Sequence, residues 1–291
     1  MRRFVSILCI VFLCSFTASA QLHRIGVGLS AGAHTMFGDT ALTNRWGPTV
    51  GIEAYYACLF PIDNTNIWIG PRTGLEAAWM QGGFEVPIKD KFSSTDYLDH
   101  QINYTVEGAV RETYNDISVA IPVMVGLKYR NLIAGLGLKV RGVVWSQAKT
   151  AVSELNTTAY FPDFDITVTN EPKLGAVTDA SEEVKGSRAT PEWHVAIAAE
   201  IGYEFEVAKH HFLGVRLFAT YDIWNSYKLN DKTDHIWSIT APTADKAAAS
   251  VSLNPLYNTA LTKLNALTVG VTLSYTFEIL KASHHCNCLP Y

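Results

Sequence analysis

The sequence lacks a second long apolar run after its first twenty residues. A helix that crosses a bilayer needs about 20 consecutive apolar residues, so we do not expect a helical membrane protein. Cysteine is also scarce, because after residue 20 only Cys58, Cys286 and Cys288 remain. Three cysteines do not make a disulfide framework. The chain has 23 Lys and Arg against 27 Asp and Glu, and this mildly acidic balance argues against a nucleic-acid partner.

The first twenty residues have the layout of a secretory signal peptide. A basic head, Met1-Arg2-Arg3, precedes an apolar run from Phe4 to Phe16 and the small-residue site Ala18-Ser19-Ala20. The apolar run is too short to span a bilayer as a helix. We expect residues 1–20 to be removed, which leaves Gln21 first. A lipoprotein anchored at Cys14 is the weaker alternative, because bulky Phe12 and Leu13 precede it.

Strict two-residue alternation dominates the remaining chain, and this is the period of a strand with two different faces. In 267–278, Leu, Val, Tyr and Phe alternate with Thr, Gly, Ser and Glu, and 193–207 alternates in the same way. Six further segments fit the pattern less regularly: 22–37, 46–60, 66–80, 114–130, 132–145 and 212–224. Most of the eight segments exceed the roughly 9–11 residues that cross a bilayer at a tilt.

The alternation fits either a soluble barrel with its apolar face inward or a membrane barrel with its apolar face outward. The other face is rich in Gly, Ser and Thr and carries charges of both signs, including Glu206. Such a face suits a packed, hydrogen-bonded lumen. The lumen charge network that we expect consists of Glu53, Arg72, Glu76, Lys128, Lys139, Arg141, Glu200, Glu204, Arg216 and Glu278.

Tryptophan positions favour the membrane alternative. Six tryptophans fall at the expected strand ends: Trp46, Trp68, Trp79, Trp145, Trp193 and Trp224. Membrane barrels gather aromatic side chains in girdles at the two membrane–water interfaces.

The connections between the expected strands alternate in length. Residues 61–65, Asn131 and 208–211 are short, whereas most of the others (38–45, 81–113, 146–192 and 225–265) are longer. This rhythm is typical of barrels with short periplasmic turns and long extracellular loops. The sequence thus predicts an all-β fold, an eight-stranded antiparallel up-and-down transmembrane β-barrel. Its barrel covers 21–278, and a periplasmic tail covers 279–291.

Two prolines interrupt this picture. Pro71 and Pro122 fall inside expected strands, where each removes one hydrogen bond from the ladder. We expect a β-bulge at each of them.

One hairpin resembles a known family. Ile121-Pro122 and Lys128-Tyr129 are followed by a tight turn and by Gly135-Leu136-Gly137. This order is similar to the central hairpin of the PorT-like outer-membrane β-barrel family. The end of the last strand, Tyr275-Thr276-Phe277, resembles the terminal signal that the barrel-assembly machinery reads. The resemblance implies an OmpA-like barrel in the outer membrane of a Gram-negative cell, among lipid and lipopolysaccharide, and it carries over no catalytic residue.

Candidate sites outside the lumen are few. The tail offers soft metal ligands, His284, His285, Cys286 and Cys288, but their crowding does not suit an ordinary structural zinc site. Cys286 and Cys288 could instead form a strained disulfide or pair with another protein. His34, His194, Ser30 and Ser118 show no nucleophile–base–acid order. We therefore expect no cofactor, no metal and no catalytic residue.

The long connections are the expected working surface, because function concentrates on loops that a rigid scaffold carries. The segment 81–113 contains Phe84, Phe92, Tyr97 and Tyr104, and 146–192 contains Tyr160, Phe161 and Phe164. The sequence favours a non-enzymatic barrel whose loops bind a protein or glycan ligand or contribute to adhesion or envelope architecture. Two alternatives stay open: an accessory of a transport or secretion machine, and a membrane-embedded lipid-modifying enzyme.

Overall fold

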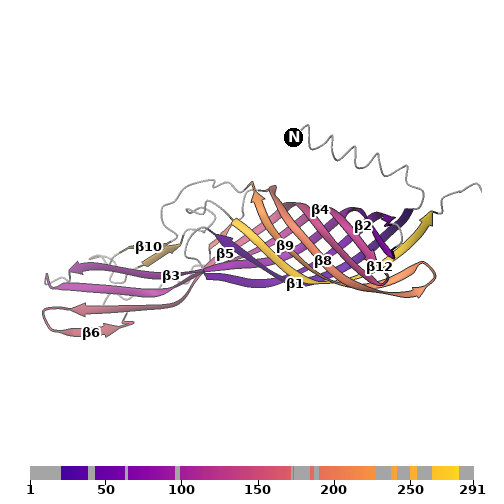
Figure 1. Cartoon of the computed structure of the whole chain (residues 1–291). Helices are drawn as coiled ribbons and strands as arrows, with labels where there is room; N and C mark the ends of the chain where they lie inside the picture. The colour runs from indigo at the N-terminus through magenta and orange to yellow at the C-terminus, as the bar shows by residue number, and fades with distance from the viewer. Residues whose placement is uncertain are drawn as a thin grey trace, which may run out of the picture.

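Eight long strands close into a ring. The computed structural model describes residues 21–38, 43–62, 65–95, 99–171, 173, 184–186, 190–226, 237–240, 250–253 and 264–281. The ring strands, in spatial order, are β1 (Gln21–Gly38), β2 (Thr43–Pro61), β3 (Ile67–Thr95), β4 (Gln101–Tyr129), β5 (Leu132–Phe161), β8 (Glu192–Ala208), β9 (His211–Asn225) and β12 (Leu264–Lys281). Every neighbouring pair is antiparallel, and β12 pairs with β1 to complete the ring (Figure 1).

Four short strands lie outside the ring. Both β6 (Ile166–Thr169) and β7 (Val184–Gly186) pair with β5. The other two, β10 (Trp237–Thr240) and β11 (Ser250–Leu253), form a separate two-stranded sheet. Among the residues that the structure describes, no helix is long and apolar enough to cross a membrane.

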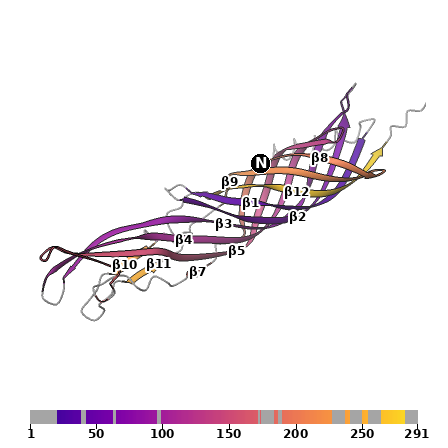
Figure 2. The same cartoon turned by 90° about the horizontal axis from the view of Figure 1, so that it is seen from below.

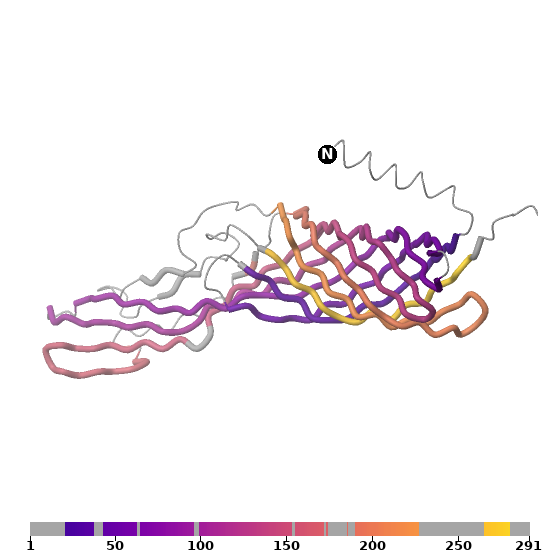
Figure 3. Tube along the Cα trace, viewed as in Figure 1, coloured from indigo at the N-terminus to yellow at the C-terminus, as the bar shows by residue number. Residues whose placement is uncertain are grey.

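The structure confirms the eight strands that the alternation predicts. It also confirms two of the short turns. Only Arg130 and Asn131 separate β4 from β5, and only Lys209 and His210 separate β8 from β9. The last strand runs three residues past the expected barrel boundary at 278, because Lys281 still pairs with Gln21. The ends of β1 and β12 lie together at one end of the ring (Figure 3).

The outer surface of the ring is apolar. On β4 the even-numbered residues from Asp116 to Lys128 are buried, whereas the odd-numbered residues are exposed and apolar from Ile117 to Leu127. At about 3.3 Å per residue and a tilt of about 40°, the run from Ile117 to Leu127 covers about 25 Å along the barrel axis. That length matches the outward apolar band of membrane barrels, which is about 25 Å tall. Leu136, Leu217 and Leu273 on other strands are each about 60% exposed, so the apolar belt continues around the ring.

Two of the segments that we predicted as loops, 81–113 and 146–192, contain long stretches of strand, so the prediction is wrong for them. The ladder between β3 and β4 keeps one register from Ile67↔Tyr129 to Thr95↔Gln101. The last rung between β2 and β3 is Thr43↔Glu85. Beyond it, β3 continues for ten residues to Thr95, about 33 Å at 3.3 Å per residue. We call the projecting sheet, made of the described residues of 86–110 and 148–169, the arm (Figure 2).

The bulges that we predicted at Pro71 and Pro122 are also absent. The β2–β3 rungs on either side of Pro71, Ala57↔Arg72 and Phe60↔Ile69, keep the same register. The same holds in β3–β4 on either side of Pro122. In both ladders the rung of the proline itself is skipped, so the missing N–H costs one hydrogen bond and no register shift.

A bulge occurs instead in β5, opposite Ile117 and Ser118. These residues pair with Trp145 and Val143, which leaves Val144 as the extra residue. Arg141 and Val143 are buried before the bulge, and Ser146 and Ala148 are buried after it. The bulge therefore exchanges the two faces of β5 where the strand leaves the ring.

Candidate functional site

Apolar side chains close the lumen at the end where β1 begins and β12 ends. Leu22, Ala57 and Leu59 are buried together, and Trp68 packs against them. We predicted Trp68 as an interfacial girdle residue, and this is wrong because Trp68 shares the inward phase of Arg72 on β3. Trp46, Trp145, Trp193 and Trp224 are exposed, at 45–55%, as girdle residues are expected to be.

The first charged layer above this cluster joins four strands. Arg24 on β1 pairs with Glu204 on β8 and, at 2.9 Å between Nε and Oε1, with Glu278 on β12. Lys128 on β4 also pairs with Glu278. Its Nζ lies 4.2 Å from the ring centroid of Phe212. Two cations and two carboxylates thus bind opposite walls of the lumen together.

The second layer contains two arginines that each contact the same two glutamates. Arg72 pairs with Glu200 and lies 3.6 Å from Glu53. Arg216 pairs with Glu53 and lies 3.0 Å from Glu200. Both guanidinium groups lie over the ring of Tyr55, with centroid distances of 4.1 and 5.1 Å. All four charged side chains are buried or nearly so, and the cross-pairing compensates each charge.

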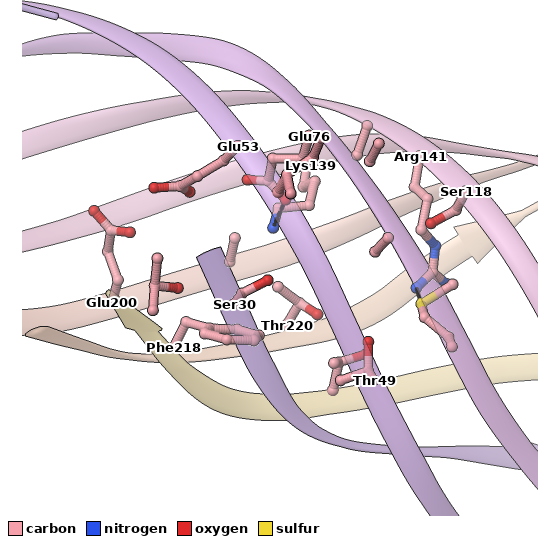
Figure 4. Close-up of a pocket in the computed structure, with 18 of the residues that line it drawn as sticks. Ser30, Thr49, Glu53, Glu76, Ser118, Lys139, Arg141, Glu200, Phe218 and Thr220 are labelled. Carbon is pink, nitrogen blue, oxygen red and sulfur yellow. Dashed lines mark hydrogen bonds and ion pairs between the residues drawn. The ribbon is translucent and has the colours of Figure 1, made fainter. Parts of the chain in front are cut away.

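A small cavity lined by both polar and apolar side chains follows this layer. Its volume is about 70 Å³, and the residues around it include Ser30, Thr49, Ser118, Phe218 and Thr220 (Figure 4). Lys139 and Glu76 meet at its wall with Nζ and Oε2 2.6 Å apart. A volume of this size has room for a few water molecules and is too small for a nutrient or a cofactor.

The last charged layer lies where the ring meets the arm. Arg141 on β5 donates to Asp222 on β9 at 2.6 Å. The imidazole of His194 lies between Asp222 and Glu192, at 2.9 Å from Nδ1 and 3.0 Å from Nε2. His34 contacts Thr268 at 2.9 Å. Each of these ionisable side chains is nearly inaccessible to solvent.

The structure places all ten residues of the expected charge network on the inward face, and each takes part in an ion pair with another lumen residue. The exception among the charges that we assigned to this face is Glu206, which is exposed beside the turn at Lys209 and His210. Glu206 still pairs in register with Phe212 and keeps the phase of Glu204, so its exposure follows from its place at the end of β8.

Sequence reasoning missed three members of the network: Arg24, Glu192 and Asp222. Arg24 alternates with the exposed residues Ile25 and Val27 and so lies on the same inward face as Gly26 and Gly28. The two-residue alternation of β1 could therefore have predicted that Arg24 faces the lumen. Ser30 and Ser118 line the cavity, whereas His34 and His194 lie in the layer beyond it. Among the described residues, no group of three or more His, Cys, Asp or Glu side chains is arranged to hold a metal ion.

The arm has an interior of its own. Ile88, Val106 and Val110 are buried together, with Phe92, Val152 and Leu155 packed against them. Nearer the tip, Ile102, Tyr104 and Ala159 form a second cluster with Phe92 and Phe161. Burial raises the pKa of the Tyr104 phenol. Three of the aromatic residues that we assigned to a binding surface, Phe92, Tyr104 and Phe161, are therefore core of the arm. Phe84 is buried nearer the ring, and Tyr160 and Phe164 are exposed.

Some predictions fall outside the described residues. They are the signal peptide in 1–20, Tyr97, and the ligand candidates His284, His285, Cys286 and Cys288. Cys58 is free and buried.

No known family matches the chain, and no curated protein matches it. Solved structures similar to it include the attachment invasion locus protein of Yersinia pestis, with 8% identity, a TM-score of 0.27, and coverage of 88% of this chain and 98% of that one. Neisserial surface protein A is 6% identical, with a TM-score of 0.25, and the match covers 90% of this chain and 98% of that one. The outer membrane protease OmpT from Escherichia coli is 8% identical, with a TM-score of 0.27, and the match covers 90% of this chain and 98% of that one. With identities and TM-scores this low, the function has to be argued from the chain's own residues.

Proposed function

We propose that this chain is a non-enzymatic outer-membrane protein that holds a rigid arm outside the cell for binding. One observation carries the proposal: β3, β4 and β5 run without a break from the apolar ring into the arm. The ring supplies the anchor, because its outward side chains suit hydrocarbon and not water. The arm supplies the display, because its buried clusters hold it as a folded sheet.

The filled lumen supports a scaffold rather than a channel. Three layers of paired charges, the Lys139–Glu76 pair, small cavities and an apolar cluster occupy the interior. Eight-stranded rings have room for little more than side chains. The carboxylates and histidines of the charged layers each contact another lumen side chain, which supports a structural role for them.

The proposal also covers insertion and family. In the last strand Tyr275, Phe277 and Ile279 alternate outward, as a signal for the barrel-assembly machinery requires. Outer-membrane lipid and lipopolysaccharide would surround the apolar belt. The hairpin of β4 and β5 around Arg130 carries the residues that resemble the PorT-like family, and we place the chain beside that family on this basis. A signal peptide over 1–20 would direct the chain to the envelope.

Cysteine labelling of intact cells tests the proposal. Gln147→Cys puts a thiol on an exposed position near the base of the arm, and Lys209→Cys puts one on the exposed turn at the opposite end of the ring. We expect a membrane-impermeant maleimide to label the first variant in intact cells and the second only after permeabilisation. The reverse pattern, or recovery of the chain as a soluble periplasmic protein, would contradict the proposal.

A further inference from the structure

The outer face at the tip of the arm is an ordered, almost uncharged surface. One rung crosses four strands and joins Ser93, Asn103, Tyr160 and Thr167. The next rung joins Lys91, Thr105, Thr158 and Thr169, and Thr95 pairs with Gln101 beyond the first. Directly paired residues point to the same side of a sheet. We call these ten residues the tip face; each of them is exposed or half-buried.

Hydrogen bonds hold the polar groups of the tip face in place. Ser93 donates to the side-chain oxygen of Asn103 at 2.7 Å, and Gln101 donates to the same oxygen at 3.1 Å. The hydroxyl of Tyr160 donates to Asp165 at 3.2 Å. Hydroxyl and amide groups still have further donors and acceptors to offer, and fixed groups lose less entropy when they bind.

The tip face differs in charge from the shaft of the arm below it. There the same side of the sheet carries the ion pairs Lys89–Glu107, at 3.6 Å, and Arg111–Glu85, at 2.8 Å. Solubility alone would be served by charges along the whole face. The replacement of charge by Thr, Ser, Asn and Gln at the tip therefore indicates a requirement other than solubility.

Exposed aromatic rings border the tip face. Tyr160 is 38% and Phe164 is 54% exposed. Phe164, from the turn between β5 and β6, lies edge-on to His100, with ring centroids 4.9 Å apart, so the two turns of the tip are joined. In the described part of the arm, Tyr160, Phe164 and Ile166 are the exposed large hydrophobic residues, and all three lie at this turn.

We infer that the tip face binds a neutral oligosaccharide, an inference that rests on the proposed function of the arm. An aromatic ring can stack against the C–H face of a sugar, and a Tyr also offers a polar group. Side-chain hydroxyls, amides and carboxylate oxygens match sugar hydroxyls as donors and acceptors. Tyr, Ser and Asn dominate other surfaces that bind by adaptable polar contacts.

Charge decides between neutral and sulfated sugars. Asp99, Asp163 and Asp165 lie at the tip turns, whereas Lys91 is the one cation of the tip face. Like charges repel, so these carboxylates disfavour a sulfated or phosphorylated chain. A protein partner would require a larger apolar centre than one Tyr, one Phe and one Ile provide.

The full-length protein in detergent tests the inference against immobilised probes. The probes are neutral hexasaccharides of glucose, mannose, galactose and N-acetylglucosamine, a heparin hexasaccharide, and poly-lysine as a protein-like cation. We expect binding to at least one neutral probe and none to heparin. Tyr160→Ala should weaken that binding at least tenfold, whereas Tyr160→Phe, which keeps the ring, should weaken it less than threefold.

Gln147→Ala, at an exposed position near the base of the arm, serves as the matched control and should bind as the parent does. Folding of each variant is checked by its gel shift on boiling. Failure to bind any neutral probe, binding to heparin or poly-lysine alone, or unchanged binding by folded Tyr160→Ala would overturn the inference. The labelling experiment is independent, so a correctly labelled arm that binds no sugar would leave the proposed function intact.

Discussion

Arg141 on β5 and Asp222 on β9 form an ion pair across the interior of the ring, with Nη2 and Oδ2 2.6 Å apart and side chains 9% and 2% exposed. Asp222 also accepts from His194. Asp222→Asn would leave the Arg141 charge buried without its carboxylate. Removal of one partner of a buried pair costs about 3–5 kcal/mol. We expect a loss of this size in the unfolding free energy, measured by denaturant titration in detergent.

Glu107→Gln is the control for this experiment. Glu107 and Lys89 form a pair at 3.6 Å whose side chains are 60% and 73% exposed. Exposed pairs contribute about 0–1 kcal/mol. If the two variants lost the same stability, the buried pair would not hold the walls of the lumen together as we describe.

The apolar belt predicts a large effect of charge on β12. Val271 is 39% exposed on the outward face, and an arginine at the midplane of a membrane barrel costs roughly 2–4 kcal/mol. We expect Val271→Arg to lower the yield of folded protein in lipid vesicles, measured as the fraction that shifts in a gel on boiling. Gln147→Arg, at an exposed position near the base of the arm, should fold as the parent does. Equal yields would argue that β12 does not face lipid.

Two glycines of one hairpin make a matched pair for packing. A Cβ at Gly137 would overlap the backbone carbonyl oxygen of Val123, whereas a Cβ at Gly126 would meet its nearest neighbour, a side-chain carbon of Leu59, at 3.6 Å. Backbone cannot move aside as a side-chain end can, and overpacking costs about 1–3 kcal/mol. We expect Gly137→Ala to reduce stability by this amount and Gly126→Ala to have little effect in the same titration. A larger loss of stability for Gly126→Ala than for Gly137→Ala would show that the strands do not approach closely at Gly137.

The filled interior predicts that the protein conducts poorly. Paired charges and an apolar cluster occupy the lumen, and the cavity between them is about 70 Å³. We expect no stable porin-like conductance from the purified protein in planar bilayers at moderate salt. Large, reproducible single-channel steps would contradict a filled lumen and would favour a transport role.

The ring could be predicted from the sequence because lipid imposes a strict rule on it. Every second residue of a membrane strand faces hydrocarbon, so the alternation of 267–278 or 193–207 shows in the sequence. The inward phase then assigns the lumen residues, including Arg24, which we missed, and Trp68, which we placed on the wrong side. Both errors concern residues close to strand ends, where few neighbours define the phase.

The arm could not be predicted in the same way. A sheet outside the bilayer needs no continuous apolar face, and the buried side of the arm mixes Thr150 and Thr157 with Ile88 and Val106. Gly82, Gly83 and Pro87 also resemble a loop in composition. The bulge at Val144 shifts the phase of β5 by one residue. For these reasons only the structure could show that β3, β4 and β5 continue beyond the membrane.

The unbroken register of β3 and β4 has a mechanical consequence. A pull on the β3–β4 tip along the arm would load in shear the many hydrogen bonds that β3 makes with β2 and β4 makes with β5, because the strands run along the direction of the force. No hinge separates arm and ring in these two strands, so tension at the tip would reach the wall of the ring undiminished. A force on a ligand bound at the tip would therefore be carried by the strands of the whole barrel rather than by a single loop.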